Sequence, residues 1–100
     1  MKHNISVKRR IKKYIPQFMH NTQNDINQLK QAAIEKNIVE MERISHSIKG
    51  YGKPFGFTEL GNLATKINTA IKASQFDEAW SLIQELEDYF SKIEIVYRDD

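Results

Sequence analysis

Apolar residues recur every three or four positions along most of this chain, which is the spacing of one face of an α-helix. Four such stretches follow one another, at residues 15–37, from residue 37 to a break between residues 50 and 57, at residues 60–74, and at residues 77–93. The first stretch, for example, has Ile15, Phe18, Ile26 and Leu29 on one face. The pattern predicts four amphipathic helices.

Local signals agree with the boundaries of these helices. Pro16 falls in the first turn of the first helix, where its missing N–H costs nothing. Asn37 precedes Glu40 by three residues, which is the spacing of a helix N-cap. Gly50 and Pro54 weaken the helical pattern and predict the end of the second helix.

No stretch shows sustained alternation of apolar and polar residues, so we expect no strand. Helices joined by short turns lie antiparallel, which predicts an all-α, up-down-up-down four-helix bundle. We expect the bundle domain to span residues 14–97 and to follow a basic N-terminal extension, an arm or short helix, at residues 1–13. We expect the tail at residues 97–100 to fray.

Composition narrows the classes of protein that remain. The chain has 100 residues and no cysteine, which excludes disulfides, thiolate zinc sites and cysteine nucleophiles. Its longest apolar run is three residues, as at residues 32–34, far short of a membrane span or a signal-peptide core. We therefore expect a soluble cytoplasmic domain without membrane insertion.

The charge is uneven along the chain. The net charge is +2, yet residues 1–13 carry six basic side chains and no acid. The remaining residues have nine basic and thirteen acidic side chains, a balance of −4. Such an arm could bind nucleic acid, an anionic membrane or an acidic protein, or it could be a solvated terminus.

His46 is the residue that points to chemistry. If Met41, Ile44 and Ile48 face the core, the rotation of about 100° per residue places His46 on a solvent-exposed face. Lys49 follows it by three positions and Gly50 by four, so both lie on the same face. An isolated surface histidine is usually inert, and a lysine near a helix end often only complements the helix dipole.

The neighbours of His46 nevertheless suit a phosphoryl group on its ring. A neutral imidazole nitrogen is a nucleophile near pH 7. Phosphoryl transfer requires alignment and positive charge near the phosphoryl oxygens, which Lys49 can supply. Gly50 would leave room for a docking partner, and Val39 would offer that partner an apolar contact.

The segment around His46 resembles the signature of histidine-containing phosphotransfer (HPt) domains. Residues 46–50 read His-Ser-Ile-Lys-Gly; Gly52, an aromatic–glycine pair at residues 55–56 and Leu60 follow. The resemblance extends over nearly the whole chain beyond about residue 12. Pro54 and Tyr51 depart from the family pattern, and Tyr51 could either pack against the bundle or crowd the site.

The resemblance implies a phosphocarrier without kinase activity, which accepts a phosphoryl group from one receiver-domain aspartate and passes it to another. It implies that His46 is phosphorylated, that Lys49 screens the phosphoryl charge and that Gly50 provides clearance. The candidate docking residues for the receiver are Val39, Glu42, Arg43 and Lys53. The implied partners are response regulator receivers and a hybrid sensor histidine kinase, with no cofactor and no metal. We expect a monomer.

Three alternatives compete with this interpretation. A sensor histidine kinase would carry an acid after the histidine, where this chain has Ser47, and an ATP-binding domain. An interaction module could bind nucleic acid or an acidic partner through the basic arm, although the arm has no aromatic residue before Tyr14 for base stacking. A metal site is disfavoured because no two of the histidines, His3, His20 and His46, have the i, i+3 or i, i+4 spacing that would place them on one helix face.

Overall fold

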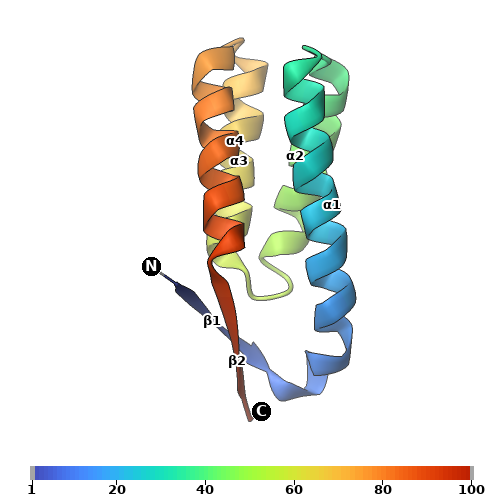
Figure 1. Ribbon diagram of the computed structural model, residues 1–100, viewed down its shortest axis with the longest axis vertical. Coiled ribbons are helices and arrows are strands. Elements are labelled where there is room, and N and C mark those ends of the chain that lie inside the picture. Colours follow the sequence, from blue (N-terminus) through green and yellow to red (C-terminus); the bar gives the residue numbers. More distant parts are fainter. Residues whose placement is uncertain (1, 100) are drawn as a thin grey trace.

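The structure is a computed structural model that describes residues 2–99. Met1 of the expected arm and Asp100 of the expected tail lie outside the described residues. Four α-helices account for most of the chain, which confirms the helical class (Figure 1). Their bounds are α1 Ile15–Ile34, α2 Ile38–Gly52, α3 Thr58–Lys72 and α4 Phe76–Ser91.

The helices pack side by side along the long axis of the molecule (Figure 1). Each contacts the next along the chain, and α1 also contacts α4. The inward stripes predicted from the sequence form one core, with Ile26, Leu29, Ile48, Ile67 and Ile83 fully buried. Burial of such side chains is the main force that holds amphipathic helices together.

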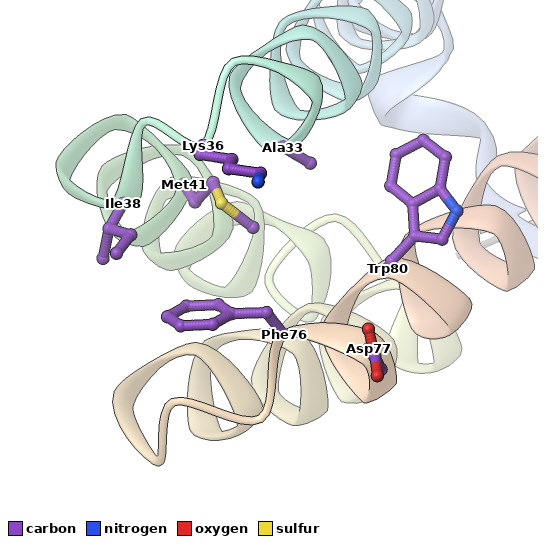
Figure 2. Close-up of a pocket in the computed structure, with 7 residues that line it drawn as sticks. All are labelled: Ala33, Lys36, Ile38, Met41, Phe76, Asp77 and Trp80. Carbon is purple, nitrogen blue, oxygen red and sulfur yellow. The ribbon is translucent and has the colours of Figure 1, made fainter.

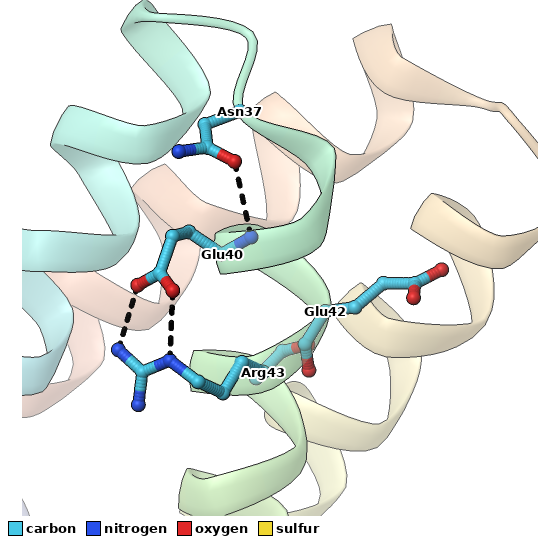
Figure 3. Close-up of polar contacts among 5 residues, drawn as sticks. Asn37, Glu40, Glu42 and Arg43 are labelled. Carbon is cyan, nitrogen blue, oxygen red and sulfur yellow. Dashed lines mark hydrogen bonds and ion pairs between the residues drawn. The ribbon is translucent and has the colours of Figure 1, made fainter.

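The α2 helix begins as the sequence predicts. The side chain of Asn37 accepts a hydrogen bond from the backbone N–H of Glu40 at 3.3 Å, so Asn37 is the N-cap (Figure 3). Glu40 does not reach back to Asn37; its carboxylate instead accepts two hydrogen bonds from Arg43, at 2.7 and 3.0 Å. The hydrogen bonds from Arg43 lower the pKa of Glu40.

A close approach of backbones joins the lower end of α2 to the start of α3. A Cβ atom added to Gly52 would lie 2.9 Å from the backbone nitrogen of Gly61. The connection between these helices is closed by a cluster of aromatic rings around Phe18, whose ring centroid lies 4.5–5.5 Å from those of Tyr51, Phe55 and Phe57. Tyr51 therefore packs against the bundle.

The expectation of no strand was wrong. Strands β1 His3–Lys8 and β2 Ile93–Arg98 pair in parallel below the helices, with His3 opposite Ile93 and Lys8 opposite Arg98 (Figure 1). The expected fraying of the tail was also wrong for Tyr97 and Arg98, which belong to β2. The pairing is stabilised because the inward side chains of both strands pack against the core.

The basic arm is ordered by contacts with the rest of the chain. After β1 it forms a 3₁₀ helix, η1 Arg9–Tyr14, which spans the expected boundary between residues 13 and 14. Arg9 forms an ion pair with Asp99 at 3.2 Å, and the ammonium group of Lys12 lies 5.2 Å from the centre of the Tyr97 ring. Two of the basic side chains of the arm therefore interact with residues near the C-terminus of the same chain.

Candidate functional site

His46 lies in the middle of α2 with an exposed side chain, while Ile44 and Ile48 on either side of it are buried. The local sequence fixes this orientation, because the apolar residues at 41, 44 and 48 must face the core. Within residues 2–99 the imidazole makes no hydrogen bond, so both ring nitrogens are open to a reactant.

A shallow groove between α2 and α3 contains His46. Its lining residues are Val39, Glu42, Arg43, His46, Asn68 and Lys72. Three of the four residues predicted to dock a receiver, Val39, Glu42 and Arg43, therefore surround the histidine. Val39 is 76% exposed, an unusual exposure for a valine, and it gives the groove an apolar rim.

The other predicted residues lie further along α2, outside the groove lining. Lys49 and Gly50 are exposed, and a Cβ atom added to Gly50 would meet nothing within 4 Å. Gly50 therefore faces open space, as expected for a position that leaves room beside His46. Lys53 caps the C-terminus of α2 and lays its aliphatic chain over Gly61, 3.0 Å from the position of an added Cβ atom.

The charges beside His46 are only partly paired. The guanidinium of Arg43 is held by Glu40, so its position is fixed and its charge is partly neutralised. Glu42 points away from this pair and has no ion-pair partner among residues 2–99 (Figure 3). Lys72 of α3 brings a further cation to the groove. An anion on His46 would therefore meet both signs of charge, with Lys72 as the groove cation that the structure does not pair with a carboxylate in residues 2–99.

Asn68 and Lys72 were not predicted as site residues. Asn68 is only 5% exposed, and its side-chain amide donates to Ser45 Oγ at 2.9 Å and to the carbonyl oxygen of Glu42 at 3.3 Å. Ser45 Oγ also donates to the Glu42 carbonyl, at 3.2 Å. These bonds hold α3 to the turn of α2 that precedes His46. The sequence did offer one signal for Asn68, because it is a polar residue among the buried apolar positions of α3.

We expect Asn68→Ala to destabilise the fold by about 1–3 kcal/mol, because it leaves buried polar groups of α2 without their partner. Urea denaturation would measure the change. Thr69→Ala, an exposed neighbour on the same helix, is the matched control and should have little effect. Equal losses in the two variants would show that the buried hydrogen bonds do not fix α2 to α3.

A second hollow lies at the end of the helices remote from the strands, where the α1–α2 turn meets the start of α4 (Figure 2). Its volume is 430 Å³ and its lining is Ala33, Lys36, Ile38, Met41, Phe76, Asp77 and Trp80. The hollow contains no histidine and shares no residue with the groove around His46. It is a separate surface.

Across residues 2–99, no three histidine or carboxylate side chains are grouped so that they could hold a metal ion. No helix in the same part of the chain is both long and apolar enough to cross a membrane.

Comparison with known proteins identifies the family. The family model described as Hpt domain matches residues 13–95, which is most of the chain and includes all four helices. No curated protein and no solved structure matches the chain significantly. Hpt domains are phosphocarrier modules of two-component phosphorelays, are not enzymes in themselves, and interact with response regulator receivers and kinases. The chain belongs to the Hpt domain family.

Proposed function

We propose that His46 receives a phosphoryl group from the aspartyl phosphate of one receiver domain and passes it to the aspartate of another. The observation that carries this proposal is an unpartnered, exposed imidazole in an open groove of an Hpt domain. In the forward step the ring nitrogen distal to the backbone forms a bond to phosphorus while the bond to the aspartate oxygen breaks. The aspartate leaves as a carboxylate, and the proton on the other ring nitrogen passes to solvent. The same steps in reverse, with the proton regained, transfer the phosphoryl group to the aspartate of the second receiver.

The surroundings of His46 support this exchange. The histidine stands clear of the helix, and Gly50 leaves the next turn free of side-chain bulk, so a receiver can approach closely. Val39 offers an apolar contact and Glu42 and Arg43 offer polar ones beside His46, while Lys53 offers a further polar contact at the C-terminus of α2. We propose that this face of α2 docks the receiver and that the chain acts in the cytoplasm, between receivers and a hybrid sensor kinase.

We propose that the chain has no kinase activity of its own. A kinase must bind ATP and align its γ-phosphate, whereas a carrier needs only a nucleophile and an approach path for an already activated phosphoryl group. We expect incubation with labelled ATP alone to leave the chain unlabelled, and addition of a phosphorylated receiver to label it. Transfer back to an unphosphorylated receiver should then follow. Labelling by ATP alone would refute the carrier assignment.

We expect Lys49→Ala to slow transfer by roughly tenfold or more without unfolding the protein, because it removes a cation one turn from the phosphoryl group. Stopped reactions with a phosphorylated receiver would give the rate, and circular dichroism would check the fold. Lys66→Ala is a matched control, since Lys66 is an exposed lysine of α3 that does not line the groove. Equal rates for the Lys49 variant and the control would remove Lys49 from the site.

A further inference from the structure

The β1–β2 ribbon leaves one edge of β2 without backbone partners. The N–H of His3 donates to the carbonyl of Lys92 at 2.7 Å, and His3 lies opposite Ile93. In a parallel pair of strands, backbone groups of alternate residues point to the same side. Because Lys92 bonds to β1, the backbone N–H and C=O groups of residues 94, 96 and 98 also point toward β1. Those of Ile93, Ile95 and Tyr97 then point to the other edge, where residues 2–99 provide no hydrogen bond to them.

The outer edge of β1 is not open in the same way. The carbonyl oxygen of Ser6 on that edge accepts a hydrogen bond from Arg98 Nη1 at 2.6 Å. The α2–α3 connection also approaches it, since a Cβ atom added to Gly56 would lie 3.9 Å from the same oxygen. An edge of unpaired alternating donors and acceptors is a template for another strand. In this ribbon the edge that can accept another strand is the edge of β2 that faces away from β1.

We propose that β2 pairs antiparallel with β2 of a second copy of this chain, forming a two-fold symmetric dimer. The outward-pointing groups set the possible registers, because Ile95 must bond to a residue that also points outward. One such register places Ile95 opposite Tyr97 of the second copy, with Val96 opposite itself on the two-fold axis. The ribbon of each copy then becomes half of a four-stranded sheet, which is more stable than two strands alone.

The side chains of β2 favour that register. Glu94, Val96 and Arg98 share the solvent face of the strand, and Val96 is 48% exposed. With Val96 on the axis, each Glu94 lies opposite Arg98 of the other copy, so unlike charges flank an apolar centre once the Arg98 side chain turns from Ser6 of its own β1 toward the partner carboxylate. Moving the register by one step places Glu94 opposite Val96 instead. A strand that is complementary to itself points to a second copy as its partner.

The position of the strand permits such a dimer. Figure 1 shows β2 continuing from α4 beyond the helices to the C-terminus. An antiparallel mate directs its own helices toward the opposite end of the shared sheet. The pairing therefore does not use the α2–α3 groove, and a dimer would present a His46 groove on each copy. The proposed dimer differs from the monomer expected from the sequence, because that expectation contained no strand.

Sedimentation equilibrium of the 100-residue chain over a range of concentrations tests the proposal. We expect a reversible monomer–dimer equilibrium. Val96→Lys places like charges opposite each other on the axis and should weaken association about tenfold or more. Thr69→Lys adds the same charge at an exposed position of α3, outside both strands, and should leave association unchanged. A monomer at every concentration, or equal effects of the two variants, would overturn the proposal.

A charge swap provides a test that does not depend on Val96. Glu94→Arg and Arg98→Glu should each weaken the dimer, and the double variant should restore it because unlike charges again face each other. Hydrogen exchange gives an independent readout. The amides of Ile95 and Tyr97 should gain protection as concentration rises, while those of Glu94 and Val96, already bonded to β1, should not. No restoration, or the reverse protection pattern, would contradict the antiparallel β2 interface.

Discussion

Replacing His46 by glutamine is expected to abolish phosphoryl acceptance while leaving the protein folded. The amide of glutamine keeps the polarity and approximate reach of the ring but is not a nucleophile, so no phosphorus–nitrogen bond can form. The native side chain is exposed and makes no hydrogen bond within the described residues 2–99. Its removal should therefore change the free energy of unfolding by no more than about 0.5 kcal/mol.

Two measurements check this expectation together. Transfer from a phosphorylated receiver gives the activity, and urea denaturation gives the stability of the same preparation. His20→Gln is the matched control, because His20 is also an exposed histidine in a helix, but on α1. It should accept phosphate at the normal rate. A large loss of stability in the His46 variant would mean that the ring is not the free surface group described above.

Substitution of Gly52 should have the largest effect on stability among the glycines of α2. In Gly52→Ala the new methyl group would lie 2.9 Å from the backbone nitrogen and 3.1 Å from the Cα of Gly61. Backbone atoms cannot rotate away as a side chain can, so the ends of α2 and α3 must separate. Overpacking of this kind costs about 1–3 kcal/mol. A domain of this size should then lose several degrees of melting temperature.

Gly50→Ala is the matched control for Gly52→Ala. It makes the same chemical change two residues away, where an added Cβ atom meets nothing within 4 Å. Alanine restricts the unfolded chain and favours the helix, so this variant should gain about 0.5–1 kcal/mol. Thermal unfolding of both variants distinguishes the two environments. Shifts of the same sign and size would show that Gly52 is not a contact point between the helices.

The helices could be predicted because their periodicity repeats over many residues. The stripe of α3, for example, continues from Leu60 through Ile67 to Ile71, and all three are buried. A cap such as Asn37 is equally local, because its hydrogen bond spans three residues. Local rules suffice where the interacting groups are neighbours in sequence.

The strands could not be predicted in the same way. Ile5 and Val7 in β1 alternate with polar residues, but in β2 the apolar Val96 interrupts the alternation of Ile93, Ile95 and Tyr97, and so short a pattern is ambiguous. The two strands lie at opposite ends of the chain, and neither is stable without the other. Their pairing depends on a long-range contact, which the residue pattern of a single segment does not reveal.

The residues of the candidate site were likewise predictable on α2 but not on α3. The exposed face of His46 followed from the rotation of one helix, so Val39, Glu42 and Arg43 were predicted as its neighbours. Asn68 and Lys72 join the groove from α3, and helical periodicity does not reveal which residues of one helix face a particular residue of another. The bonds from Asn68 to Ser45 and Glu42 became visible only with the packing of α2 on α3.

The identity of the phosphorylated residue is the most direct test of the central claim. The chain should be phosphorylated by a receiver, digested, and analysed by mass spectrometry under conditions that preserve phosphohistidine. The phosphate should be acid-labile and base-stable, and it should lie on the peptide that contains His46, with none on peptides of His3 or His20. Phosphate on another residue, or a base-labile acyl phosphate, would contradict the assignment of His46 as the carrier.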